Sequence, residues 1–284
     1  MFTSLNGHSG LIWCYGVTQE PNTQNYALIL PFMENGSLRS YLNKNFNSIT
    51  WNQKLGIIYS ISKGLISLHI KNFMHKDLHL GNVLQSENIT IYGTSISDFG
   101  FCKPVDEISS NSNNRNTYGV LPYMAPEILC GNEYTQKSDV YSLGIIMNEV
   151  ISIVPPFNDV SHDEHLALGI CRGKRPKMRE ETPELLKELI QQCWDADPEN
   201  RPTSKEVFGK LDDLRKNLEK LEELSYDFSD TTNTKLFETH PQAIYTSQLL
   251  NFSNLPEPVN CPNQEEFISS KNGKFTIMLF YFLL

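Results

Sequence analysis

The segment "HKDLHLGN" at residues 75–82, with the triplet "DFG" at residues 98–100, decides the fold of this chain. Asp77 and Asn82 lie within the first segment, and Asp98 supplies a second carboxylate downstream. Carboxylate and carboxamide oxygens are hard ligands of the kind that Mg²⁺ prefers. Each residue alone is commonly part of a turn. Together, in this order, they indicate a site that holds metal ions and a substrate hydroxyl.

Three further motifs follow in the chain: "APE" at residues 125–127, "SDVYSLG" at 138–144 and "DPENRP" at 197–202. With the first two segments they resemble, in order and spacing, the motifs of eukaryotic protein kinases, which include HRDLxxxN and DFG. The resemblance covers about residues 8–215. It implies an α+β protein-kinase-like fold, mainly the helical large lobe, preceded by a remnant of the small lobe formed by that lobe's fourth and fifth strands.

The resemblance also implies boundaries. We expect a partial small lobe and hinge over residues 1–33, the large lobe over 34–223 and a largely flexible tail over 224–284. Within the tail, residues 243–258 are apolar enough to dock on their own lobe or on a partner, and the sequence leaves this open. The apolar C-terminal end, residues 275–284, is too short to span a bilayer, which needs about twenty residues.

Periodicity and capping signals predict the main elements. Strands are expected over residues 10–18 and 26–33, a short helix over 38–42 and a buried helix over 139–153. Capping boxes at Thr50–Gln53 and Thr203–Glu206 mark the starts of two helices. Thr182 is expected to cap another helix with Pro183 at its first position. Apolar residues between Val207 and Leu221 favour packing of the last helix on the lobe over a dimer seam.

The resemblance assigns chemical roles to the two metal-binding motifs. Asp77 would accept or orient the proton of an attacking hydroxyl, and Asn82 and Asp98 would bind Mg²⁺. The implied reaction transfers the γ-phosphoryl group of ATP to a hydroxyl of a protein substrate in signalling. Enzymes accelerate this reaction mainly by positioning and by neutralising charge. ATP and Mg²⁺ are therefore the expected cofactors.

The resemblance also assigns residues around the nucleotide. Leu30 would guard a back pocket, Pro31 and Met33 would offer a backbone carbonyl and amide to adenine, and Leu84 would lie beneath it. Leu30 and Leu84 also fit the pattern of ordinary core residues. Five further residues are expected to support the site: His75 stacked on Phe99, Glu127 paired with Arg201, and Asp139 bound to the backbone of the loop at 75–82.

Several positions depart from the family pattern. Lys76 replaces an arginine and lacks the planar fork that grips a phosphate. His79 and Gly81 replace a lysine typical of serine/threonine kinases and an arginine common in tyrosine kinases. Val120 stands in place of a threonine of serine/threonine kinases, whereas Tyr123 is typical of that class. The prediction therefore leans toward serine and threonine acceptors, with tyrosine left open.

Two alternatives remain. The segment at 75–84 also resembles the loop of aminoglycoside and choline phosphotransferases, which lack the three downstream motifs. The second alternative is a catalytically inactive pseudokinase that acts as a protein-binding scaffold. The first acidic residue is Glu20 and the first lysine is Lys44, both too late for the family's helix glutamate and strand lysine, and no glycine-rich phosphate loop is present. Losing one such donor costs about 3–4 kcal/mol in the transition state, so poor catalysis is expected.

Composition limits the partners. The chain has 24 basic and 33 acidic residues, a net charge of -9, which opposes binding to nucleic acid or an anionic membrane. Its six cysteines are scattered, as expected of free thiols in a reducing compartment. No basic region followed by an apolar run marks a signal peptide, so a cytoplasmic protein without a membrane span is expected. The oligomeric state is not predicted.

Overall fold

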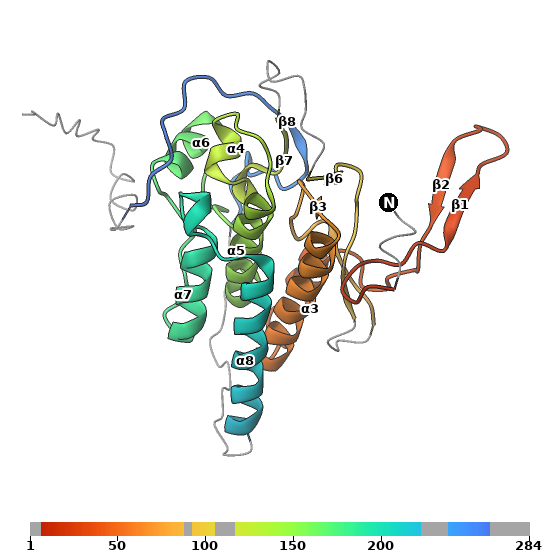
Figure 1. Cartoon of the computed structure of the whole chain (residues 1–284), viewed down its shortest axis with the longest axis horizontal. Helices are drawn as coiled ribbons and strands as arrows, with labels where there is room; N and C mark the ends of the chain where they lie inside the picture. Colours follow the sequence, from red (N-terminus) through yellow and green to blue (C-terminus); the bar gives the residue numbers. More distant parts are fainter. Residues whose placement is uncertain (1–6, 88–92, 106–116, 223–237, 262–284) are drawn as a thin grey trace, which may run out of the picture.

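The computed structural model describes residues 7–87, 93–105, 117–222 and 238–261. Helices α3 (Trp51–Ile70), α5 (Gln136–Ser152), α7 (Glu184–Cys193) and α8 (Ser204–Glu222) form the bulk of the molecule (Figure 1). Short two-stranded sheets surround them, so the fold is mixed α+β and mostly helical, as predicted. Helix α3 packs against α8 and α5, and α5 packs against α7. The core therefore lies around α5, whose residues 138–152 are all buried.

Helix α3 positions the loop that carries the candidate site. Its N-terminus is the capping box predicted from the sequence, in which Thr50 and Gln53 bond each other's backbone amides. Apolar side chains at helical spacing, such as Ile58, Ile61 and Leu65, are fully buried. After the helix ends, Asn72 takes a left-handed conformation (φ 58°) and turns the chain into strand β3 (Phe73–Met74).

The helix predicted over residues 139–153 is α5, and it begins earlier, at Gln136. A capping box formed by Thr135 and Ser138 causes this earlier start. Helix α8 begins with the predicted capping box: the Thr203 amide donates to Glu206 Oε2 at 2.7 Å. Val207 and Leu211 are buried against the lobe, as predicted. The side chains of Leu218 and Leu221 lie outside the described residues.

The predicted cap of α7 is wrong by one residue. Pro183, rather than Thr182, is the N-cap, because its backbone stays extended (ψ 137°). Its carbonyl accepts the first helical bonds, from Leu186 N at 2.9 Å and Lys187 N at 3.0 Å. The hydroxyl of Thr182 is buried and has no hydrogen-bond partner within the described ranges.

The N-terminal hairpin projects away from the helices (Figure 1). It pairs β1 (Gly16–Gln19) with β2 (Tyr26–Ile29), both shorter than the predicted strands. The first strand starts late because residues 10–12 bridge to another strand instead: Ile12 N donates to Ile96 O at 2.8 Å, and Ile96 N donates to Gly10 O at 2.8 Å. Gly10 has φ 83°, and a side chain on Gly64 would overlap its backbone. Two glycines therefore allow this segment to cross α3.

The remaining elements are short. They are helices α2 (Leu38–Asn45), α4 (Pro126–Leu129) and α6 (Glu164–Cys171), and the 3₁₀ turns η1 (Leu121–Tyr123) and η2 (Pro198–Asn200). Strand β3 pairs with β6 (Lys103–Pro104), β4 (Val83–Gln85) with β5 (Thr94–Ile96), and β7 (Thr117–Gly119) with β8 (Gln248–Leu250). None of the helices in the described ranges has the length and hydropathy that crossing a membrane requires.

The tail segment, which we define as residues 238–261, lies against the lobe. It passes over α4 and α6 and forms β8 beside β7 (Figure 1). The Val259 amide donates to Cys171 O at 2.9 Å, and Asn260 Oδ1 accepts from the Ala196 amide at 2.9 Å. The stretch at 243–258 thus lies against its own lobe, which is one of the two alternatives that the sequence leaves open. The rest of the predicted tail and the apolar end lie outside the described residues.

Candidate active site

The backbone of the loop at residues 75–82 is fixed by Asp139, in the first turn of α5. The Asp139 carboxylate accepts from His75 N at 2.8 Å and Lys76 N at 3.0 Å, and His69 Nε2 lies 3.1 Å from it. Burial raises the pKa of Asp139, but the hydrogen bonds and nearby imidazoles outweigh this and hold it below its usual value. The carboxylate therefore stays charged and pins the loop in the place expected from the sequence.

Asp77 lies at the centre of this loop, with its side chain almost fully buried. Asn82 Nδ2 donates to the Asp77 carbonyl at 2.9 Å and to Oδ2 at 3.2 Å, and His79 Nε2 lies 3.7 Å from Oδ2. The hydroxyl of Ser247 donates to the same Oδ2 at 2.6 Å. Burial raises the pKa of Asp77, but His79 and Ser247 outweigh it and lower the pKa below its usual value. Asp77 is therefore an ionised acceptor at neutral pH.

The pairing of β4 with β5 places Asn82 and Asp98 at one end of the two strands. Asn82 precedes β4, Ser97 follows β5, and the Asn82 carbonyl accepts from both Ser97 N and Ser97 Oγ at 2.8 Å. Asp98 is the next residue, has φ 56° and exposes its side chain. The two predicted metal ligands therefore lie at the same end of one hairpin.

This donor set fits Mg²⁺. The amide nitrogen of Asn82 is turned toward Asp77, which leaves its Oδ1 as the ligand atom. Asp98 adds an exposed carboxylate, and one of its oxygens accepts from Gly100 N at 3.3 Å. One carboxylate and one carboxamide suit an ion that keeps several waters and takes further oxygens from phosphates.

His75 and Phe99 link the loop to the "DFG" triplet. Their rings make an edge contact with centroids 5.7 Å apart, and His75 Nε2 lies 3.0 Å from the Ser97 carbonyl. Both side chains are buried. This contact, expected from the sequence, joins the segments that carry Asp77 and Asp98.

The expected nucleotide residues are less completely assembled. Met33 and Leu84 pack against the core, and an isolated antiparallel β-bridge pairs Ser37 with Leu84. Pro31 is half-buried, whereas Leu30 is 38% exposed. Leu30 therefore lacks the burial of a core residue in the described part of the chain, and its expected role as a pocket guard stays a prediction.

The segment after β7 is anchored by the Glu127–Arg201 pair. Arg201 Nη1 and Nη2 each donate to one Glu127 oxygen at 2.7 Å, and the arginine is 1% exposed. Its remaining donors reach the carbonyls of Asp195, Lys137 and Ala196. The predicted pairing is thus a fully satisfied, buried ion pair.

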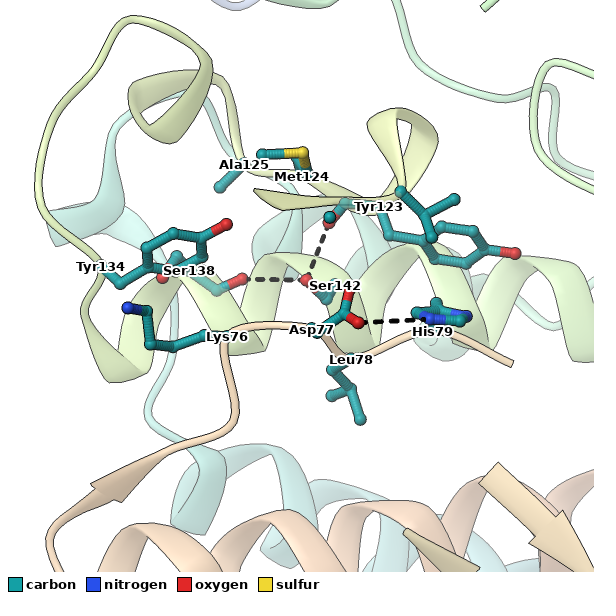
Figure 2. Close-up of a pocket in the computed structure, with 12 residues that line it drawn as sticks. Lys76, Asp77, Leu78, His79, Tyr123, Met124, Ala125, Tyr134, Ser138 and Ser142 are labelled. Carbon is teal, nitrogen blue, oxygen red and sulfur yellow. Dashed lines mark hydrogen bonds and ion pairs between the residues drawn. The ribbon is translucent and has the colours of Figure 1, made fainter. Parts of the chain in front are cut away.

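A pocket opens on one side of Asp77. It lies between the loop at 75–82 and residues 119–125, with α5 behind it (Figure 2). From α5, Ser142 Oγ donates to the Tyr123 carbonyl at 2.7 Å and so fixes the upper wall. Lys76 projects toward the Tyr134 ring, with Nζ 4.8 Å from its centroid (Figure 2). A lysine at this position thus stacks on an aromatic ring.

The unusual pair His79 and Gly81 has a steric explanation. Gly81 N donates to His79 Nδ1 at 3.0 Å, so the imidazole folds back over the glycine. A Cβ at Gly81 would lie 2.6 Å from the His79 ring. This folding directs His79 Nε2 to Asp77 and Ser247. The sequence shows both residues but gives no sign of this arrangement.

A buried polar cluster beside the pocket was also missed. Tyr123 OH donates to Glu149, Arg39 donates to Tyr123 OH, and Arg39 Nε lies 3.4 Å from Glu149 Oε1. Burial raises the pKa of Glu149, only partly offset by Arg39. Arg39 and Glu149 are 110 positions apart, and neither belongs to a recognisable motif. Ser247 was missed for the same reason, although its apolar surroundings suggested docking.

Comparison with known proteins identifies the family. The family model described as protein tyrosine and serine/threonine kinase matches residues 1–211. Similar proteins include the dual specificity protein kinase splA of Dictyostelium discoideum, 29% identical over 73% of this chain and 9% of the relative. A protein kinase and PP2C-like domain-containing protein of Arabidopsis thaliana is 29% identical, over 89% of this chain and 42% of the relative. Ephrin type-A receptor 4-A of Xenopus laevis is 30% identical, over 81% and 23%.

The chain spans about a tenth of the first relatives, 9%, 11% and 12% of their lengths. The residues matched by the family model, 1–211, include Asp77, Asn82 and Asp98. Because the family model covers most of the chain, the family is established: this chain belongs to the protein tyrosine and serine/threonine kinases.

Proposed function

We propose that this chain transfers the γ-phosphoryl group of ATP to serine or threonine hydroxyls of proteins, as part of signalling. The observation that carries the proposal is the carboxylate of Asp77, which is bonded by Asn82 in a loop pinned by Asp139. Asp98 lies at the same end of the β4–β5 hairpin as Asn82. Base and metal ligands therefore share one site.

The residues act by positioning. Bound ATP with Mg²⁺ supplies the phosphoryl group and neutralises its charge. Asn82 Oδ1 and Asp98 would hold the metal. Pro31, Met33 and Leu84 would contact adenine, and Leu30 would guard the back pocket. Asp77 Oδ2 orients the acceptor hydroxyl and takes its proton, and the lowered pKa of this carboxyl keeps it ionised for that task.

The preference for serine and threonine is supported by the side-chain length that fits between β8 and Asp77. Strand β8 is held beside β7, and Ser247 immediately precedes it. With the backbone in this position, the short side chain of Ser247 places its hydroxyl 2.6 Å from Asp77 Oδ2. A tyrosine side chain is several ångströms longer and would need its backbone held farther away. Tyr123, fixed by Glu149 and Arg39, forms the wall beside this path.

Transfer from labelled ATP into a mixture of protein acceptors, followed by phosphoamino acid analysis, tests the proposal. We expect Mg²⁺-dependent label on serine and threonine. Label mainly on tyrosine would contradict the acceptor preference. Absence of any transfer would contradict the enzymatic proposal and favour the scaffold.

Nucleotide binding separates the two functions further. An enzyme binds ATP only with Mg²⁺, and Asp98→Asn should abolish that binding. The matched control is Asp213→Asn, an exposed aspartate on α8, which should bind normally. A scaffold would show no Mg²⁺-dependent heat in calorimetry with either variant or with the wild type.

We further propose a large lobe over 34–223, preceded by the partial small lobe at 1–33 and followed by the tail at 224–284. A cytoplasmic location is supported by the six scattered cysteines, none of which forms a disulfide in the described part of the chain. Protein substrates are the expected partners, and the acidic net charge of -9 opposes nucleic acid.

A further inference from the structure

The hydroxyl of Ser247 occupies the place where an acceptor must lie. It donates to Asp77 Oδ2 at 2.6 Å and lies 3.2 Å from His79 Nε2. A general base must lie within about 2.6–3.2 Å of the atom whose proton it removes. Ser247 therefore meets the geometric requirement for proton transfer to Asp77.

The backbone after Ser247 is held as an added strand. Gln248, Leu249 and Leu250 pair antiparallel with Gly119, Tyr118 and Thr117 in turn. Leu250 is 7% exposed and enters the hydrophobic core. Strand addition with one buried side chain is a common mode of peptide recognition, in which backbone bonds give affinity and the side-chain pocket fixes the register.

The backbone before Ser247 is held by an aromatic anchor. The Tyr245 ring lies 4.5 Å from the Arg39 guanidinium and makes an edge contact with His162, with centroids 4.8 Å apart. Tyr245 OH donates to Pro156 O at 3.0 Å, and its carbonyl accepts from Arg39 Nη1 at 3.2 Å. Contacts on both sides of Ser247 therefore hold its backbone beside Asp77.

The neighbouring hydroxyl provides an internal comparison. Thr246 is exposed, whereas Ser247 is half-buried and faces Asp77. Of these two adjacent hydroxyls, Ser247 is therefore the one that the chain places at Asp77.

We propose that Ser247 is a phosphorylation site of this chain's own active site, presented in cis by the tail segment. This proposal rests on the phosphotransferase function proposed above. In the step, the Ser247 Oγ–P bond forms, the bond from the γ-phosphorus to the bridging oxygen of ATP breaks, and ADP leaves with that electron pair. The hydroxyl proton passes to Asp77 Oδ2. MgATP is the only co-reactant.

The test incubates the full chain with MgATP and an added protein acceptor, and maps phosphate by tandem mass spectrometry. We expect phosphate at Ser247, lost in Ser247→Ala and retained in Ser247→Thr and in the control Thr246→Ala. Phosphate on the added acceptor but none at Ser247 would overturn this inference and leave the proposed function standing. Phosphate nowhere would overturn both.

Dilution and mixing test the intramolecular route. For a reaction in cis, the half-time of Ser247 labelling is independent of protein concentration. Wild-type chain mixed with a mass-tagged Asp77→Asn chain should label only the wild type. Label on the tagged chain, or a half-time that lengthens in proportion to dilution, would show transfer between molecules and overturn the cis assignment.

Discussion

Asp139 holds the loop at 75–82 by hydrogen bonds to its ionised carboxylate, so this contact depends on pH. Its lowered pKa means that the folded state binds fewer protons than the unfolded state near pH 4. The stability it provides is therefore present above the unfolded pKa of about 3.9 and is lost as pH falls through the folded value. In urea titrations between pH 6 and pH 3, Asp139→Asn should show a shallower loss of stability than wild type. Asp213→Asn should keep the wild-type slope, and a wild-type slope in Asp139→Asn would contradict the assignment.

The Glu127–Arg201 pair shows the cost of an uncompensated buried charge. Glu127→Gln would leave a guanidinium that is 1% exposed without its carboxylate, so we expect a loss of about 3–5 kcal/mol in the free energy of unfolding. Glu184→Gln is the matched control, because that side chain is 75% exposed and lies 3.7 Å from Lys187. It should cost less than about 1 kcal/mol. Equal losses in urea unfolding would contradict the role given to burial.

At the scale of elements, the pairing of β8 with β7 should respond to a charge placed at Ser247. Ser247→Glu places a second carboxylate beside the ionised Asp77, and like charges this close repel. We expect β8 to detach, so that backbone amides of residues 248–250 exchange hydrogen faster. Thr246→Glu adds the same charge at an exposed neighbour and should leave exchange near the wild-type rate. Equal acceleration by both variants would indicate a general charge effect rather than contact with Asp77.

The elements also show which features the sequence can predict. The boxes at Thr50 and Thr203 depend on residues three positions apart, so local pattern is sufficient to find them. The start of β1 was misjudged because residues 10–12 pair with Ile96, far along the chain. Ser247 and Asp77 are 170 positions apart, and no local pattern encodes their contact. Asp77, Asn82 and Asp98 could be singled out from the sequence because they lie in motifs of fixed spacing, and their chemical roles stay predictions.

At the scale of the whole molecule, stability is unevenly distributed. The helical core buries α5 almost completely, whereas the β1–β2 hairpin exposes large apolar side chains such as Tyr26 at 78%. A two-stranded hairpin is marginally stable alone. We expect amides of β1 and β2 to exchange by local opening, well before those of α3, which should exchange only on global unfolding. Equal protection of both elements would contradict this distribution.

At the same scale, activity of the chain should depend on Asp77 as the base of a phosphotransferase site. The most direct measurement is the initial rate of phosphoryl transfer from MgATP to a protein acceptor by wild type, Asp77→Asn and the control Asp213→Asn. General-base removal typically costs about 10²–10⁴-fold, so Asp77→Asn should lose at least two orders of magnitude while Asp213→Asn keeps the wild-type rate. Transfer by Asp77→Asn at the wild-type rate would contradict the account.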